Sequence, residues 1–303
     1  MQKAVITGIT GFVGSALARR LLSDGVKVYG VGRKSNILTE LNAFGDFVPV
    51  QASFSMYGRL HEMIDETGFD MFWHLAWQGT STSTSAYNDY DIQVVNIQAA
   101  CDAAVLARRL NCKCVAACGS YYQYCRTGES LLAAWNPSIY GICKQSGSDL
   151  FKAIANKNDM PCRNLIFPNI IGVGDKPNAA VLFFIKRLLE DEPLNLISGE
   201  HPDDWIDIKD LVEGIISAAI DGKDNVDYYI GHRKISTFKE KLLEMKAILG
   251  SSSDLMFGTY PETHRVDYSK IDTEALHRDT GFEPKISFAK SVQDTAEWLR
   301  KRM

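Results

Sequence analysis

The 303-residue sequence predicts an α/β fold, in which a doubly wound parallel sheet is followed by a smaller, mixed C-terminal domain. Three observations support this prediction. Short β-branched runs alternate with amphipathic helical stretches from the first residues on, the runs are apolar throughout, and the alternation fades beyond Pro168. Strands that are apolar on both faces and separated by helices form parallel sheets covered by helices on each side.

The elements of the first part follow one another in this alternating order. The expected strands are 3–7, 26–32, 47–50, 70–76, 112–118 and 162–167. The expected helices are 12–25, 58–67, 88–110 and 138–157. We therefore expect residues 1–167 to form one domain that contains the parallel sheet.

The second part, residues 168–303, mixes short apolar runs with helices. The elements expected there are a helix at 179–190, apolar runs at 194–197 and 205–208, a helix at 211–220, a strand at 226–230 and further helices to the terminus. No linker rich in proline or serine separates the halves, so we expect the smaller domain to pack on the first, with a segment around 203–232 returning to it. Ligands of open α/β sheets bind outside the carboxyl ends of the strands, where such a domain closes a cleft.

The charge balance excludes several classes of partner. Lys and Arg number 33 against 37 Asp and Glu, which gives a net charge of -4, and no basic arm or acidic tail is present. We therefore expect no nucleic-acid partner and no binding to a membrane surface. The segment before the first glycine cluster is too short for a signal peptide, and no apolar run approaches the length of a membrane span. A cytoplasmic protein is expected.

The seven cysteines do not predict a disulfide framework, because their number is odd and they are scattered over the middle of the chain. Cys112 and Cys114 are separated by one residue and lie in a predicted buried strand. Structural zinc sites instead use paired Cys-x-x-Cys knuckles or nearby histidines. We therefore expect reduced core thiols and no metal site.

A glycine cluster, TGITGFVGS, directly follows the first predicted strand and opens the first predicted helix. Its glycines are Gly8, Gly11 and Gly14. Glycines at such a junction allow a tight turn and a close approach of the backbone to a pyrophosphate, while the helix N-terminus supplies N–H donors. The loop therefore predicts a dinucleotide-binding domain of the Rossmann type over residues 1–167.

The end of the second predicted strand bears on the choice of cofactor. An NAD-preferring protein carries an acidic residue there for the ribose 2′-hydroxyl, but this chain has Gly32, followed by Arg33 and Lys34. A guanidinium suits a ribose 2′-phosphate by charge and by geometry. A solvated basic loop is the alternative interpretation. NADP(H) is the favoured cofactor, and NAD(H) is possible.

Tyr140 and Lys144 lie four positions apart on a predicted helix, so they share one face. An ordinary amphipathic helix contains such pairs too. The predicted strand 112–118, however, runs into Ser120 and brings it to the carboxyl edge of the sheet. A free phenol has a pKa of about 10 and is a poor base unless nearby cations favour the phenolate. These three residues are the candidate catalytic group.

Together these motifs resemble those of the extended short-chain dehydrogenases/reductases, the NAD(P)-dependent epimerase/dehydratase family. The residues that carry the resemblance are Thr7, Gly8, Gly11, Gly14, the HLA at His74–Ala76, Asn96, Ser120, Tyr140 and Lys144. Two residues separate each pair of glycines, as in that family, and the resemblance covers essentially the whole chain. It implies an enzyme that acts on a nucleotide sugar, and a homodimer formed through the two long helices, 88–110 and 138–157.

The resemblance also implies roles for individual residues. In the family the matching serine binds the substrate oxygen, the tyrosine transfers a proton and the lysine binds the nicotinamide ribose, which gives the catalytic residues Ser120, Tyr140 and Lys144. The implied cofactor-binding residues are Thr7, Gly8, Thr10, Gly11, Phe12, Val13, Gly14, Arg33, Lys34, Ser53, Leu75, Ala76, Asn96, Tyr140, Lys144 and Pro168. The implied substrate-binding residues are Trp77, Ser120, Tyr121, Asn169 and Arg265.

The residues after Ser120 bear on the reaction. The family's 4,6-dehydratases carry Asp-Glu there for the elimination of water, whereas this chain has Tyr121 and Tyr122, so the elimination lacks its acid and base. Arg33 favours a reductase that consumes NADPH. The expected function is NADPH-dependent reduction of a keto group on a 4-keto-6-deoxy nucleotide sugar. The alternatives are a nucleotide-sugar 4-epimerase with tightly bound NAD(P), and a non-catalytic NADP(H)-binding sensor or scaffold.

One residue departs from the family pattern on the substrate side. Asp203 stands where the resemblance places an arginine that pairs with a substrate phosphate, and an aspartate would repel that phosphate. Arg265 is the candidate to compensate, and a surface-loop arginine is the alternative. The sugar and the nucleotide are left open by the sequence.

Overall fold

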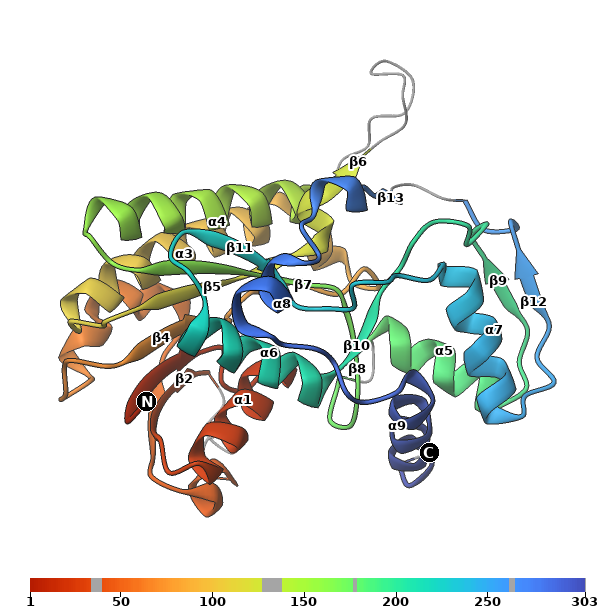
Figure 1. Ribbon diagram of the computed structural model, residues 1–303, viewed down its shortest axis with the longest axis horizontal. Coiled ribbons are helices and arrows are strands. Elements are labelled where there is room, and N and C mark those ends of the chain that lie inside the picture. Colours follow the sequence, from red (N-terminus) through yellow and green to blue (C-terminus); the bar gives the residue numbers. More distant parts are fainter. Residues whose placement is uncertain (34–39, 127–137, 177–178, 262–264, 303) are drawn as a thin grey trace.

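A seven-stranded parallel sheet forms the centre of the computed structural model, which describes residues 1–33, 40–126, 138–176, 179–261 and 265–302 (Figure 1). The strand order is β11-β7-β5-β4-β1-β2-β3, and each neighbouring pair is parallel. The strands are β1 (Lys3–Thr7), β2 (Lys27–Gly32), β3 (Phe47–Gln51), β4 (Met71–His74), β5 (Val115–Ser120), β7 (Cys162–Phe167) and β11 (Val226–Tyr229). The predicted doubly wound parallel sheet is confirmed.

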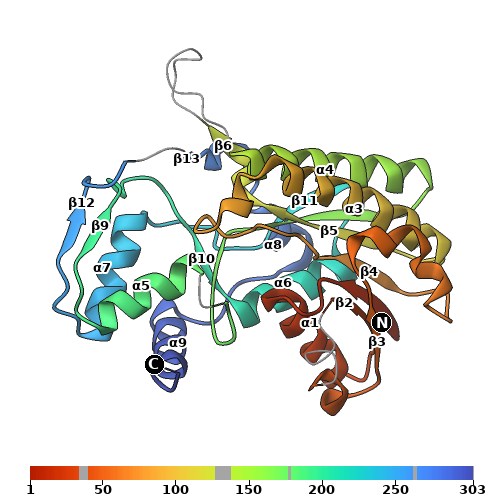
Figure 2. The ribbon, with the colours of Figure 1, turned by 180° about the vertical axis from the view of Figure 1, so that it is seen from behind.

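Helices cover both faces of this sheet (Figures 1 and 2). One face carries α1 (Phe12–Ser23), α6 (Ile208–Asp221) and α8 (Ala275–Thr280). The other carries α3 (Tyr90–Arg109), α4 (Ile139–Lys157) and the 3-10 helix η2 (Phe54–Glu62). Each face has its own apolar cluster, because successive side chains of a strand point to opposite sides. Among the helices of the described ranges, none is long and apolar enough to cross a membrane.

The starts of α3 and α4 are fixed by side-chain caps. The Asp89 carboxylate accepts a hydrogen bond from the Ile92 backbone N–H, and the Ser138 hydroxyl accepts one from Gly141. Both caps satisfy N–H groups that the helix leaves unpaired in its first turn. Small buried side chains of α3, including Ala99 and Ala103, let the two helices lie side by side against the sheet.

The remaining elements gather beyond the carboxyl edge of the sheet. They are α5 (Ala180–Leu189), α7 (Phe238–Leu249), α9 (Phe288–Arg300) and two parallel strand pairs, β8 (Asn169–Ile171) with β10 (Trp205–Asp207) and β9 (Leu194–Leu196) with β12 (Leu255–Phe257). A third apolar cluster around Trp205 holds them together. Between these pieces the chain goes back to the central sheet as α6 and β11. The division into domains at residue 167 stays a prediction.

A late segment of the chain also contacts the sheet edge. The short strand β13 (Arg265–Val266) pairs antiparallel with β6 (Cys125–Arg126), next to the 3-10 helix η4 (Tyr121–Tyr124). The 3-10 helix η5 (Tyr268–Lys270) follows, and two others, η1 (Asn42–Phe44) and η3 (Ser85–Tyr87), lie earlier in the chain. Residues 265–271 thereby cover the segment that begins at Ser120.

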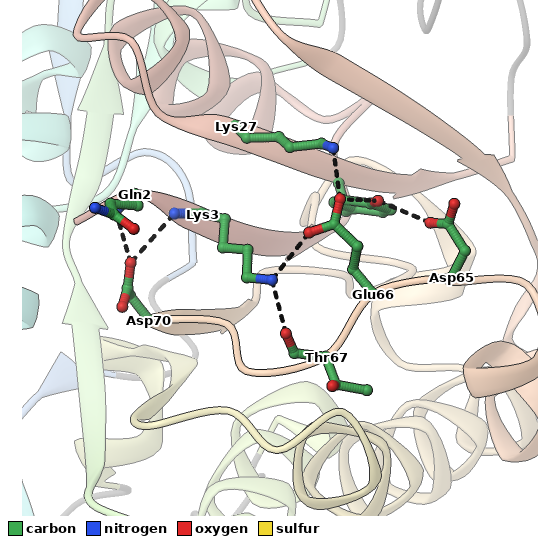
Figure 3. A network of polar contacts seen from close by, with 8 residues as sticks. Gln2, Lys3, Lys27, Asp65, Glu66, Thr67 and Asp70 are labelled. Carbon is green, nitrogen blue, oxygen red and sulfur yellow. Dashed lines mark hydrogen bonds and ion pairs between the residues drawn. The ribbon is translucent and has the colours of Figure 1, made fainter.

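The predicted helix 58–67 is wrong in its second half, because acidic residues there bind the amino edge of the sheet (Figure 3). The Glu66 carboxylate accepts hydrogen bonds from Lys3 Nζ at 2.9 Å and Lys27 Nζ at 2.5 Å, and the Tyr29 hydroxyl donates to Asp65 at 2.8 Å. These bonds hold the chain in an open turn, so the helical part is η2 alone. The network lies at the end of the sheet opposite to the candidate site.

Candidate active site

A cleft lies at the carboxyl edge of the sheet, at the position where the strand order reverses. β1 has β2 on one side and β4 on the other. From β1 the strand order therefore runs through β2 and β3 to one edge of the sheet, and through β4 and β5 toward the other. The segments that follow β1, β4, β5 and β7 all contribute to the walls of the cleft. Such switch points are where open α/β sheets bind their ligands.

The glycine loop forms the floor of one half of the cleft and is shaped for close approach. Gly8 has φ +76°, and a Cβ there would stand 2.6 Å from the Ala76 backbone nitrogen. A Cβ on Gly14 would stand 2.3 Å from the Gly8 carbonyl oxygen. Helix α1 starts after Gly11 without a side-chain cap, which leaves its first N–H groups to bind an anionic ligand. The loop therefore fits the pyrophosphate of a dinucleotide.

Beneath this loop, a buried pair joins β1 to β4. Thr7 Oγ1 and His74 Nδ1 are 2.9 Å apart, and neither residue lines the cleft. Burial, with a further contribution from the nearby Lys144 charge, lowers the pKa of His74 to about 3. A neutral His74 is therefore a structural support for the loop.

The loop after β4 is held by two buried amides of α3. Asn96 Oδ1 accepts a hydrogen bond from the Gln78 backbone N–H at 2.7 Å, and Gln93 Oε1 accepts one from Trp77 Nε1 at 2.8 Å. Gln93 also donates to the Gly79 carbonyl oxygen at 3.0 Å. These bonds fix Trp77 in the wall of the cleft. Asn96 itself is fully buried and acts on the cleft through the loop.

The three candidate catalytic residues meet in the middle of the cleft. Ser120 ends β5, and its hydroxyl accepts a hydrogen bond from the Tyr122 N–H at 3.3 Å, while its own N–H donates to Gln123. Tyr140 and Lys144 come from the first turns of α4, which passes beside β5. All three line the cleft.

Lys144 is only 1% exposed, and its ammonium is held from two sides. Its Nζ donates to the Cys118 carbonyl oxygen at 2.8 Å and lies 4.0 Å from the ring centroid of Trp77. Gly147, one turn later in α4, leaves room for that indole, since a Cβ there would stand 3.1 Å from it. Burial lowers the pKa of Lys144, although the neighbouring Cys118 thiol acts in the opposite direction.

Tyr140 lies within an aromatic group. Its ring centroid is 4.8 Å from that of Tyr87 and 6.4 Å from that of Trp77, and it is 6% exposed. Burial raises the pKa of Tyr140, whereas a hydrogen bond with Ser120 acts in the opposite direction. A phenol in this environment stays protonated at neutral pH and is poised to donate its proton.

Behind the part of the cleft that Tyr121 and Asn169 line lies Asp203, which is 5% exposed. Its carboxylate accepts hydrogen bonds from Asn169 Nδ2 at 3.0 Å, from Trp205 Nε1 at 2.6 Å and from the Tyr121 hydroxyl at 3.4 Å. Burial raises the pKa of Asp203 to about 7, although the bond from Trp205 acts in the opposite direction. The residue is thus part of a buried network and not of the cleft wall.

The structure brings most of the candidate residues to the cleft, but not all. Those that line it are Gly8, Gly11, Phe12, Val13, Gly14, Leu75, Trp77, Ser120, Tyr121, Tyr140, Lys144, Pro168 and Asn169. The candidate residues that the structure describes but that do not line the cleft are Thr7, Thr10, Arg33, Ser53, Ala76, Asn96 and Arg265. Arg33 is exposed just after β2, and Lys34 lies outside the described residues. The roles implied for all of them stay predictions.

Several lining residues were not predicted. The loop after β4 contributes Thr80, Ser81 and Thr82, and the loop after β8 contributes Asp175 and Lys176. The run of hydroxyl residues TSTSTS directly behind a strand end was a signal for the first group. Burial raises the pKa of Asp175 to about 6, with a bond from the Lys176 N–H acting against it.

Relatives of this chain are nucleotide-sugar enzymes. It is 24% identical over 99% of its length to UDP-glucose 4-epimerase of Mycolicibacterium smegmatis, of which 99% is covered, and 21% identical to CDP-abequose synthase of Salmonella typhimurium, with 98% of each chain covered. The solved structure of UDP-glucose 4-epimerase from Thermotoga maritima with UDP-glucose superposes with a TM-score of 0.80 at 23% identity, over 99% of both chains.

A second solved structure, dTDP-glucose 4,6-dehydratase from Streptomyces venezuelae with NAD bound, superposes with a TM-score of 0.81 at 21% identity and covers 99% of this chain and 97% of that one. These superpositions confirm the Rossmann-like fold. The sequence model of the NAD dependent epimerase/dehydratase family matches residues 4–231. That match spans the glycine loop, the cleft and the returning strand β11, and so this chain belongs to the NAD-dependent epimerase/dehydratase family, a group of extended short-chain dehydrogenase/reductase enzymes.

Proposed function

We propose that this protein catalyses the NADPH-dependent reduction of a keto group on a nucleotide-activated sugar of the 4-keto-6-deoxy type. The observation that carries the proposal is the meeting of Ser120, Tyr140 and Lys144 in one cleft, with the buried ammonium of Lys144 6.0 Å from the ring centroid of Tyr140. Reduction of a ketone requires a proton at the carbonyl oxygen, whereas oxidation of a carbinol requires its removal. A phenol is protonated at neutral pH, so Tyr140 can supply this proton.

The chain supplies proton transfer and positioning for this reaction. A bound reduced nicotinamide supplies the hydride to the carbonyl carbon. Ser120 donates a hydrogen bond to the carbonyl oxygen, and Tyr140 transfers its proton to the same oxygen as the negative charge develops. Lys144, held against Trp77 and Cys118, stabilises the phenolate left on Tyr140. The glycine loop and the α1 N-terminus hold the pyrophosphate.

The preference for NADPH is supported by the end of β2. A Cβ on Gly32 would stand 2.8 Å from Ile9 Cγ2 and from Thr10 Cγ2, so these side chains fill the space where an acid for the ribose 2′-hydroxyl would sit. The exposed Arg33 directly follows. Replacing Arg33 with serine should weaken NADPH binding about tenfold or more and leave NADH binding unchanged, since only NADPH carries a 2′-phosphate. Equal losses for both cofactors would contradict the preference.

A nucleotide-sugar 4-epimerase is the second candidate, because relatives named as UDP-glucose 4-epimerases match over 99% of this chain. Cofactor content separates the two. An epimerase regenerates its cofactor within each turnover and retains it, whereas a reductase exchanges it. Protein purified without added cofactor should therefore release little nucleotide on denaturation and bind NADPH reversibly. Stoichiometric NAD(H) in the denatured supernatant would support the epimerase instead.

We also propose that the enzyme is a homodimer formed through α3 and α4. Apolar side chains on these helices are exposed in the single chain, among them Val94 at 48%, Ile142 at 46% and Leu150 at 45%. An exposed apolar stripe on two adjacent helices favours burial against a second copy. Sedimentation should give twice the 33.7 kDa of one chain, and a monomer at micromolar concentration would contradict this proposal.

A further inference from the structure

Asp203 shapes what the substrate half of the cleft offers to a ligand. It lies in the turn before β10, and its two oxygens accept four hydrogen bonds from three side chains. Two of those donors, Asn169 and Tyr121, themselves line the cleft. The carboxylate therefore acts on a ligand through Asn169 and Tyr121, while the hydrogen bond from Trp205 Nε1 holds the carboxylate in place.

The chemistry of the carboxylate fixes the orientation of the Asn169 amide. An ionised carboxylate only accepts hydrogen bonds, so the NH2 group of Asn169 must point toward Asp203. The amide oxygen of Asn169 is then the atom left for a ligand. The Tyr121 hydroxyl likewise donates its hydrogen bond to Asp203, which leaves its oxygen as an acceptor. Both side chains thus present acceptors to the cleft.

The charges nearby reinforce this preference. Asp204, 1% exposed, adds a second buried carboxylate, which accepts hydrogen bonds from the Tyr229 hydroxyl and the His232 N–H. Asp175 lines the cleft itself. Among the described lining residues the cations are Lys144 and Lys176, and the ammonium of Lys144 is already bound to Cys118. The two buried carboxylates behind Asn169 and Tyr121 therefore disfavour an anion at these two residues.

We propose that Asp203 is a specificity-determining residue, which turns Asn169 and Tyr121 into hydrogen-bond acceptors and so selects a neutral, hydroxyl- or amine-bearing group of the substrate while excluding a phosphate from this position. The inference rests on the proposed function only in that the cleft binds a sugar substrate.

The test is binding of UDP-glucose, measured by titration calorimetry, to the wild-type protein and to Asp203→Asn. The replacement keeps an acceptor oxygen for Trp205, and its NH2 group takes the place of the oxygen that accepts from Tyr121 and Asn169. The Asn169 amide then turns its own NH2 group, and Tyr121 its hydroxyl proton, toward the cleft. We expect the variant to bind UDP-glucose at least about tenfold more tightly than wild type near pH 8. Equal or weaker binding by the variant would overturn the proposal, as would undetectable binding by both proteins.

Asp204→Asn is the matched control. It removes a buried negative charge at the next position, but its oxygens face Tyr229 and His232 and do not orient Asn169. We expect its affinity for UDP-glucose to equal that of wild type. An Asp204→Asn variant that gains as much affinity as Asp203→Asn would show a general charge effect and overturn the proposal. Circular dichroism and NADPH binding verify that each variant is folded.

The pH dependence of wild type gives a second measurement that needs no variant. The ionisable groups facing Asp203 are Tyr121, Tyr122, Tyr268 and Asp204. Because burial raises the pKa of Asp203 to about 7, wild type should bind UDP-glucose more tightly as the pH falls through neutrality, and the gap to Asp203→Asn should close. A gap that stays constant with pH would overturn the proposal. Absence of NADPH binding by folded wild type would contradict the proposed function alone.

Discussion

Replacing Lys144 with methionine should stabilise the fold while abolishing hydride transfer. The ammonium gains about 1.5–3 kcal/mol from its bond to the Cys118 carbonyl and up to about 2 kcal/mol from the Trp77 ring. Burying an unpaired cation costs several kcal/mol. Burial lowers the pKa of Lys144 against the opposing effect of the Cys118 thiol, so the fold disfavours the charged form. We therefore expect the variant to gain about 1 kcal/mol in the free energy of unfolding, or about 2 °C in Tm.

Urea unfolding, followed by circular dichroism, measures this gain. The pKa of Lys144 is lower in the folded than in the unfolded chain, whose value is 10.5. Wild type therefore gains stability as the pH rises from the folded-state pKa to the unfolded-state pKa. The stability advantage of the variant should shrink over the same pH range. Lys152→Met, on the same helix, is the control and should be slightly destabilised, since Lys152 is bound to Asp227 at 2.8 Å. A Lys144→Met protein that loses more than about 1 kcal/mol would refute the reasoning.

The other predictions concern the glycine loop and the amino edge of the sheet. Gly14→Ala should weaken NADPH binding by about tenfold or more in a fluorescence titration, because its methyl group would press on the Gly8 carbonyl from 2.3 Å; unchanged affinity would mean that the loop does not hold the cofactor. Glu66→Gln should lower the free energy of unfolding by about 1 kcal/mol at neutral pH, through the lost bonds to Lys3 and Lys27. Those bonds lower the pKa of Glu66 from 4.5 to about 2, so the stability they supply is present above pH 4.5 and lost toward pH 2. The difference in free energy of unfolding between the two proteins, measured with urea, should therefore vanish near pH 2. A difference that persists in acid would contradict this role of Glu66.

The sequence could indicate which residues meet at the carboxyl edge of the sheet for a physical reason. Gly8 and Pro168 each follow a strand of one parallel sheet and Ser120 ends another, so a correct strand assignment places them at the same edge. Tyr140 and Lys144 then follow from helical periodicity, since α4 packs beside β5. The apolar runs and the glycine loop carry all of this information locally.

The surroundings of Asn169 could not be predicted in the same way, because the contacts there join distant segments. Asn169 and Asp203 are 34 residues apart and meet only because β8 pairs with β10. In the sequence, Asp203 was notable only because the family pattern has an arginine at that position. In the structure it is a buried hydrogen-bond acceptor for the amide of Asn169. The second half of 58–67 illustrates the same limit, since its charges bind strands far away in sequence.

Single-turnover oxidation of NADPH, followed by its absorbance with a 4-keto-6-deoxy nucleotide sugar, tests the central claim most directly. Wild type should convert one keto group for each NADPH consumed, and Tyr140→Phe should bind NADPH normally but transfer hydride at least about a hundredfold more slowly, since it lacks the proton donor. Interconversion of UDP-glucose and UDP-galactose without net NADPH oxidation, or an unchanged rate for Tyr140→Phe, would contradict the account.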